Sequence, residues 1–334
     1  MDDAIVELSG LRVSLPVAGE HREVLRGIDL RLEAGESLGL VGESGSGKSM
    51  TARTVGRLLP RNARVEGSVR VLGRDVWSLR GGALRAHRAD VAMVFQNPRA
   101  HINPVRTIGD FMTEALRTVR RVDRRTSRRL ATEALVDLAV TDPERRLGQY
   151  PHELSGGLLQ RVLIAAMLLM EPKLLLADEP STALDVTTQA DLIALLDALR
   201  RRRGMSMLFI THDLDLAAAI CDRTAVMYAG QIVEVRGSSL LHHEARHPYS
   251  AALAAARPPL ERTLDRLPAI PGRPLSAFEA PEGCAFASRC RFAVDECRSG
   301  PIPLEETQGG TVRCIRADEL HAASALREVQ QHGV

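Results

Sequence analysis

The sequence predicts an α/β fold built on a parallel sheet. Short apolar runs at 37–41, 174–177 and 207–210 are typical of strands that are buried on both faces. A distinctive segment lies just past each run: a glycine-rich loop, an acidic pair or a histidine. Parallel sheets bind ligands at the carboxyl ends of their strands. These three segments are therefore the first candidates for a functional site.

Length and composition narrow the class of protein. The 334 residues are enough for two domains, or for one large α/β domain with an appendage. A net charge of +2 points to no particular partner, and 3% aromatic residues argue against a surface that stacks nucleic-acid bases. The first residues lack the pattern of a signal peptide, and the longest apolar run, 162–170, is too short to cross a bilayer. We therefore expect a cytoplasmic chain that does not span a membrane.

Residues 42–49, GESGSGKS, match the phosphate-loop pattern G-x-x-x-x-G-K-[ST] between an expected strand and an expected helix that stops at Pro60. Glycines let the backbone N–H groups face one anion. Lys48 is one of only two lysines among 44 basic residues, which indicates that this position needs a compact ammonium to reach the outer phosphates. Ser49 offers a hydroxyl to Mg²⁺. The predicted nucleotide contacts are Gly42, Glu43, Ser44, Gly45, Ser46, Gly47, Lys48, Ser49 and Met50. A chance glycine-rich turn is the alternative, and the flanking elements disfavour it.

An acidic pair ends the second apolar strand, LLLAD. Asp178 suits a magnesium contact, and Glu179 suits a base that orients or deprotonates water. An acidic pair after a strand is usually a turn or a helix cap. The complete phosphate loop in the same chain favours the catalytic interpretation.

Three further segments carry polar residues at strand or helix ends. Ser155 is a natural N-cap for a helix that runs to about Met170, and the two glycines after it expose N–H groups to an anion. Gln96 follows an apolar stretch at 91–95, and His212 follows the strand at 207–210. A single glutamine or histidine at a strand end usually has a structural role. Here the residues occur in one order behind separate strands, which favours a common functional site.

In the order and spacing of these motifs, residues 4–240 resemble the ATP-binding subunits of ABC transporters. The resemblance implies a P-loop NTPase core with an antiparallel β subdomain and a helical subdomain at about 97–165. It also implies ATP bound between two subunits, with the phosphate loop of one facing the signature segment of the other. The implied catalytic residues are Glu179, His212 and Gln96; the Mg²⁺ ligands are Ser49, Gln96 and Asp178; the signature residues are Leu154, Ser155, Gly156, Gly157 and Gln160; and Asp185 ends the STALD segment that crosses between subunits.

Two positions depart from the family pattern. Leu158 stands where many relatives have glutamine, and Leu15 stands about where relatives place an aromatic ring on adenine. No catalytic position is replaced, so we expect hydrolysis at this subunit's own site. A basic stretch between Arg120 and Arg129 lacks interleaved aromatic residues, which favours a solvated helix face over a nucleic-acid patch.

The last residues, 241–334, are predicted to form a separate small, irregular, cysteine-rich domain. Segments such as RHPYS at 246–250 and IPGRP at 270–274 resemble the C-terminal extension of oligopeptide and dipeptide importer ATPases, which nickel and some sugar importers share. Four of the five cysteines lie here: Cys284, Cys290, Cys297 and Cys314. Thiolate ligation suits an iron–sulfur cluster or zinc, and the resemblance favours a structural 4Fe-4S cluster over zinc and over unliganded thiols.

These resemblances imply an ATPase that powers solute import, with peptides as the expected substrate and nickel or another small solute as the alternative. The expected partners are a second ATPase subunit (a distinct homologue by family habit), two transmembrane permeases and an extracytoplasmic binding protein. We expect no nucleic-acid partner. A soluble ABC ATPase that acts on nucleic acid or the ribosome is the rival class, but such proteins usually carry two cassettes or a long coiled-coil insertion. A regulatory subunit that binds ATP without cleaving it is a third interpretation.

Overall fold

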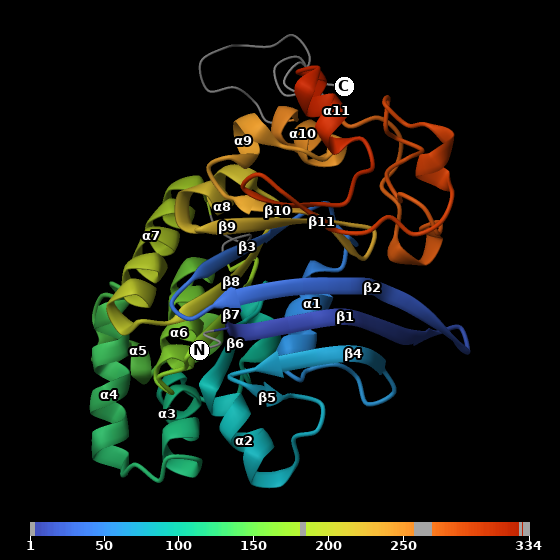
Figure 1. Ribbon diagram of the computed structural model, residues 1–334. Helices are drawn as coiled ribbons and strands as arrows, with labels where there is room; N and C mark the ends of the chain where they lie inside the picture. Colours follow the sequence, from blue (N-terminus) through green and yellow to red (C-terminus); the bar gives the residue numbers. More distant parts are fainter. Residues whose placement is uncertain (1–3, 181–184, 257–268, 327–328, 330–334) are drawn as a thin grey trace. The chain divides into compact units, whose positions relative to one another are not determined.

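The computed structural model describes residues 4–180, 185–256, 269–326 and 329 (Figure 1). The chain divides into two compact units. The first unit combines Met1–Trp77 with Phe209–Val334, and the second unit comprises Ser78–Leu208. The described residues beyond 240 therefore belong to the same compact unit as the amino-terminal strands. The domain boundary that composition predicts near residue 240 stays a prediction.

The first unit begins with the expected antiparallel sheet, whose strand order is β2-β1-β4-β5. Between the first two strands, Ala18 (φ 52°) and Gly19 (φ 88°) form a two-residue turn with both residues in the left-handed region, which matches the twist of a β-hairpin. The strands are β1 (Ala4–Val17), β2 (Glu20–Glu33), β4 (Arg64–Val71) and β5 (Arg74–Asp75).

A second group of strands in the first unit includes β3, the strand that directly precedes the phosphate loop. Strand β3 (Ser37–Val41) is fully buried and pairs in parallel with β9 (Arg223–Tyr228), as a strand covered on both faces should. Strand β10 (Gln231–Gly237) returns antiparallel through a turn at Ala229 and Gly230. The short strands β12 (Gly310–Val312) and β11 (Glu305–Thr307) extend this antiparallel part, so the tail supplies two strands.

The helices of the first unit are short. Helix α1 (Lys48–Val55) follows the phosphate loop and ends at Gly56, earlier than the expected stop at Pro60. Glycine is a poor helix former, and Arg57 adopts a left-handed φ of 58°, so the chain leaves the helix there. The other helices are α8 (Leu214–Ile220), α9 (Leu241–Glu244), α10 (Pro248–Ala255) and α11 (Ala317–Ala322), with 3₁₀ turns η3 (Ala277–Glu279) and η4 (Asp295–Arg298).

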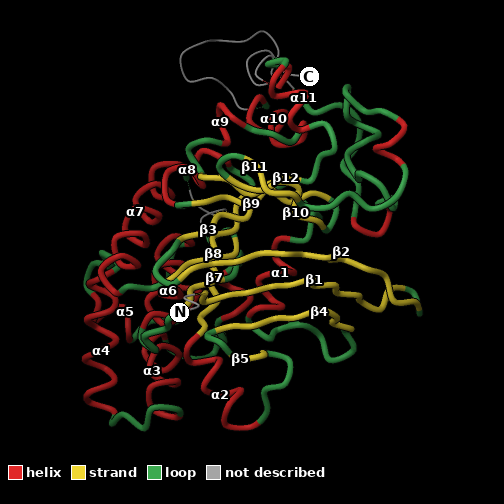
Figure 2. Tube along the Cα trace, viewed as in Figure 1, coloured by secondary structure: helices red, strands yellow, loops and turns green. Residues whose placement is uncertain are grey.

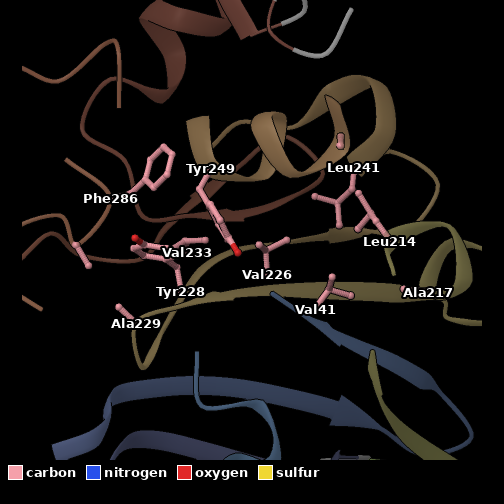
Figure 3. Packing of buried hydrophobic residues seen from close by; sticks show 12 residues of the cluster. Val41, Leu214, Ala217, Val226, Tyr228, Ala229, Val233, Leu241, Tyr249 and Phe286 are labelled. Atoms are coloured by element: carbon pink, nitrogen blue, oxygen red, sulfur yellow. The ribbon is translucent and has the colours of Figure 1, made fainter. Parts of the chain in front are cut away.

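A buried apolar cluster joins α8, α9 and α10 to β3, β9 and β10 (Figure 3). It contains Val41 from β3, Val226 and Tyr228 from β9, Tyr249 from α10 and Phe286 from the tail. Val41 and Phe286, which are far apart in the sequence, thus share one core. Tail residues therefore pack in the same cluster as the strand that carries the phosphate loop.

The second unit is mostly helical. Figure 2 shows α3, α4, α5 and α6 as neighbouring helices with no strand among them. Strands β6 (Val91–Val94) and β7 (Leu174–Asp178) are buried and pair in parallel, as the apolar runs predict. The helices are α2 (Gly81–Asp90), α3 (Ile108–Thr118), α4 (Arg124–Asp137), α5 (Pro143–Leu147), α6 (Gly156–Leu168) and α7 (Val186–Arg203), with 3₁₀ turns η1 (Pro98–His101) and η2 (Pro151–Glu153).

Strand β8 (Ser206–Thr211) contains the division between the two units and ends just before His212. Helix α7 begins at its N-cap Asp185 and ends at Gly204, which adopts the left-handed conformation expected of a C-terminal glycine. Within the described part of the chain, no helix combines the length and the apolar content that crossing a membrane requires.

Candidate functional site

The phosphate loop turns sharply between β3 and α1. A Cβ atom on Gly42 would lie 2.1 Å from the carbonyl oxygen of Met227, and one on Gly47 would lie 2.8 Å from side-chain carbons of Leu25 and Met227. Gly47 also has a φ of 109°, in the region that favours glycine. The Ser46 carbonyl accepts a hydrogen bond from Gly230 N–H at 2.8 Å. Close packing therefore requires glycine at positions 42 and 47.

Lys48 is the first residue of α1, and its ammonium folds back over the loop. Nζ donates to the carbonyl oxygens of Gly42 at 2.6 Å and Glu43 at 3.0 Å. The residue is only 6% exposed. Ser49 and Met50 are half-buried, whereas Ser44 and Gly45 at the tip of the loop are exposed. A buried ammonium held across the mouth of a glycine-rich turn is an arrangement that can receive the outer phosphates of a nucleotide.

The second unit brings together the two predicted residues Gln96 and Glu179. Gln96 Nε2 donates to Glu179 Oε2 at 2.9 Å, although 83 positions separate them in the sequence. The parallel pairing of β6 with β7 places both strand ends at one edge, as the sequence predicts. Asp178, the last residue of β7, is 5% exposed, and Glu179 leaves the strand with a left-handed φ of 45°.

The signature segment begins a helix as expected. Ser155 is the N-cap of α6, and its Oγ accepts a hydrogen bond from Leu158 N–H at 3.3 Å. Ser155 is exposed, and a Cβ on Gly156 would meet no described atom within 4 Å. By contrast, Gln160 is 2% exposed, and its side-chain nitrogen and oxygen have no hydrogen-bond partner among the described residues. The structure therefore places Gln160 inside the helix packing and Ser155 on the surface.

Two other predicted residues lie at helix starts. Asp185 Oδ1 accepts a hydrogen bond from Thr188 N–H at 3.0 Å, and the bonds from Thr188 lower the pKa of this carboxyl group. Residues 181–184, the rest of the STALD segment, lie outside the described residues. His212 is exposed between β8 and Asp213, the N-cap of α8. Both side chains are thus placed at element boundaries.

The four tail cysteines line one cavity, together with Phe286, Phe292 and Arg316 among other residues. Burial raises the pKa of the Cys284 thiol to about 11 and that of Cys314 to about 12, and the neighbouring cysteines add to both shifts. Such thiols are protonated at neutral pH, so any metal must displace their protons. Among the described residues, no group of three or more His, Cys, Asp or Glu side chains is arranged to hold a metal ion. The predicted cluster is therefore not confirmed.

Sequence reasoning did not identify two residues that contact the phosphate loop. Arg289 forms an ion pair with Glu43 at 2.8 Å, and the Tyr249 hydroxyl accepts a hydrogen bond from the Glu43 N–H at 3.0 Å. The two side chains lie 246 and 206 positions from Glu43 along the chain. No local pattern connects residues at such separations, so the sequence carried no signal for this contact.

Fold and site together define a P-loop ATPase: a phosphate loop on a buried strand of the first unit, and an acidic strand end bonded to a glutamine in the second. The family described as ABC transporter matches residues 25–182, and the family described as oligopeptide/dipeptide transporter, C-terminal region, matches residues 233–297.

Curated relatives extend the match to nearly the whole chain. A protein of Brucella abortus (strain 2308) named as a peptide import ATP-binding protein is 44% identical, over 93% of this chain and 94% of its own. A protein of Brucella ovis with the same kind of name is 42% identical, over 95% of this chain and 98% of its own. The chain therefore belongs to the ABC transporter family of ATP-binding proteins.

Solved structures agree with this assignment. The ATP-binding cassette MJ0796, in a dimeric post-hydrolysis state bound to ADP and Pi, matches with a TM-score of 0.63 and 28% identity, over 70% of this chain and 98% of that chain. The structure of cbiO1 from Clostridium perfringens matches with the same TM-score of 0.63 at 23% identity, which supports the fold alone. The predicted α/β class and ATPase core are confirmed.

Proposed function

We propose that this chain is the ATP-hydrolysing subunit of an importer that takes up peptides across the cytoplasmic membrane. One observation carries the proposal: a single chain combines an ATPase core with the C-terminal region described for oligopeptide and dipeptide transporters. The names of relatives at 42% and 44% identity support it. Nickel or another small solute of the same importer family is the alternative substrate.

The proposed partners are those of a peptide importer, which the C-terminal region and the names of the relatives support. Translocation would take place through two transmembrane permease subunits. A second ATPase subunit, expected to be a distinct homologue, would present its own signature segment to the nucleotide held here. An extracytoplasmic binding protein would deliver the solute. The chain would then act at the cytoplasmic face of the membrane.

In the proposed mechanism, Lys48 and the loop N–H groups bind the terminal phosphates of ATP. Ser49, Gln96 and Asp178 would hold Mg²⁺, which neutralises phosphate charge, and their hydroxyl, amide and carboxylate oxygens are donors that Mg²⁺ prefers. Glu179 accepts a proton from the attacking water, and the Gln96 amide orients its carboxylate through the 2.9 Å hydrogen bond. His212 donates to a phosphate oxygen, and Ser155 and its two glycines face the nucleotide of the second subunit.

The substrate is tested by isolating the intact transporter and identifying the solute that its binding protein carries. We expect peptides, and ATP hydrolysis by the reconstituted complex that rises when the loaded binding protein is added. A binding protein that carries nickel or a sugar would overturn the peptide assignment without affecting the ATPase assignment.

We also propose that Cys284, Cys290, Cys297 and Cys314 ligate a structural 4Fe-4S cluster, with zinc as the alternative occupant. Their common cavity supports this, as does the all-thiol donor set. We expect anaerobically purified protein to contain iron and acid-labile sulfide and to absorb visible light. Changing Cys290→Ser should remove this absorption, while Cys221→Ser, far along the sequence, should not. Colourless protein that holds zinc, or no metal, would overturn the cluster.

A further inference from the structure

Glu43, the second residue of the phosphate loop, is held at all three of its polar groups. Its N–H donates to the Tyr249 hydroxyl at 3.0 Å. Its carboxylate accepts two hydrogen bonds from the Arg289 guanidinium, at 2.8 Å from Nη1 and 3.2 Å from Nη2. Its carbonyl accepts from Lys48 Nζ at 3.0 Å. Two of the three partners come from the tail, and the third is the lysine of the phosphate loop itself.

Backbone carbonyls of the tail hold the Arg289 side chain, in addition to its ion pair with Glu43. Its Nε donates to the Pro271 carbonyl at 2.7 Å, and its Nη2 donates to the Ile270 carbonyl at 3.3 Å. Nη1 also donates to the Tyr228 hydroxyl at 3.3 Å. The Arg289 side chain is 4% exposed, against 22% for Glu43. A planar guanidinium held in this way offers its two remaining donors in one fixed orientation.

Tyr249 is fixed in a similar way. It lies in the first turn of α10, where its N–H donates to His247 Nδ1 at 3.0 Å. Its ring packs against Tyr228, with centroids 4.7 Å apart, and against Phe286 at 5.3 Å. Figure 3 shows Tyr249 extending from α10 toward the strand residues Tyr228 and Val226. The hydroxyl that accepts the Glu43 N–H is therefore held by a rigid, buried ring.

We propose that Arg289 and Tyr249 are positioning residues for ATP binding, which act through Glu43 to hold the first turn of the phosphate loop. Two physical effects follow from the geometry. A loop that is fixed in advance loses less conformational entropy when a nucleotide binds. The Arg289 charge also neutralises a carboxylate at the start of the loop, which would otherwise repel the triphosphate. The tail is thereby part of the nucleotide site, in addition to any role as a separate domain.

The same contact has a purely structural interpretation, in which Arg289 only joins the carbonyls of residues 270 and 271 to the rest of the tail. The two interpretations differ in their dependence on Glu43. If the carboxylate matters because it is left unpaired beside the phosphates, then neutralising it should compensate for the loss of Arg289. If Arg289 only holds the tail together, a change at Glu43 should compensate for nothing.

The test measures the Kd for Mg-ATP of the full-length chain, together with KM and kcat of the assembled transporter. Arg289→Met should raise Kd and KM about tenfold with kcat nearly unchanged, because it leaves a half-buried carboxylate unpaired. Tyr249→Phe, which keeps the ring and loses only the hydroxyl, should raise both about threefold. Arg273→Met is the matched control: it removes another tail arginine, whose ion pair with Glu279 is exposed, and it should change neither constant.

The double variant with Glu43→Gln and Arg289→Met decides between the interpretations. We expect its Kd to return to within about threefold of the wild-type value. A Kd for Arg289→Met equal to that of Arg273→Met overturns the proposal. The proposal is also overturned if Arg289→Met lowers the thermal stability and the added Glu43→Gln change restores neither the thermal stability nor the Kd. If Arg289→Met does not fold, an unchanged Kd in Tyr249→Phe overturns the proposal. Wild-type protein that fails to bind Mg-ATP would instead count against the ATPase function.

Discussion

Replacing Glu179 with glutamine is expected to slow ATP hydrolysis by about 10²–10⁴-fold, the usual contribution of a general base, while Mg-ATP binding is retained. The amide keeps the size of the carboxylate, and its oxygen can still accept the hydrogen bond from Gln96 Nε2 that the structure shows at 2.9 Å. The change therefore removes proton acceptance and leaves the local geometry in place. Single-turnover hydrolysis and nucleotide retention by the same preparation measure the two effects separately.

The matched control for this variant is Glu171→Gln, which makes the same chemical change at an exposed residue just before β7. We expect it to hydrolyse ATP at the wild-type rate. Equal hydrolysis by Glu179→Gln and wild-type protein would refute the proposed role and favour an ATPase that uses another base. Loss of both hydrolysis and nucleotide retention would indicate that Glu179 is needed for binding.

Replacing Lys48 with alanine is expected to weaken Mg-ATP binding about 100-fold or more, because the loop loses the positive charge proposed to bind the outer phosphates. Lys48 Nζ also bridges the carbonyls of Gly42 and Glu43, so the loop loses an internal clamp at the same time. Lys48→Arg should recover little of this loss, since a planar fork is wider than an ammonium and the site is 6% exposed. Equilibrium titration with Mg-ATP measures both variants.

The other lysine of the chain provides the control for this experiment. Lys173 is exposed at the start of β7, and Lys173→Ala should leave the Kd for Mg-ATP unchanged. The two lysine variants carry the same loss of one positive charge, so a general electrostatic effect would appear in both. An equal Kd for Lys48→Ala and Lys173→Ala would contradict the assignment of the phosphate loop.

Local patterns were sufficient for most of the strands and for the elements that carry the proposed site residues. The phosphate loop, the strand that ends at Asp178 and the N-cap Ser155 all lie where the sequence predicts them. Each depends on residues within one turn or one strand, so its signal is contained in a short window. The helix after the phosphate loop shows the limit: it was expected to reach Pro60, and it ends at Gly56 because glycine leaves a helix more readily.

By itself, the sequence determined the class of protein and the chemical groups of the site, because phosphate loops, acidic strand ends and helix caps are local features. Only the tertiary structure decided that Gln160 is buried while Ser155 is exposed, and that Gln96 bonds to Glu179. It also decided that Arg289 and Tyr249 reach across 246 and 206 positions to hold Glu43. The physical reason is that these contacts form when distant segments pack together. The spacing of residues along the chain does not indicate which distant residue completes an ion pair.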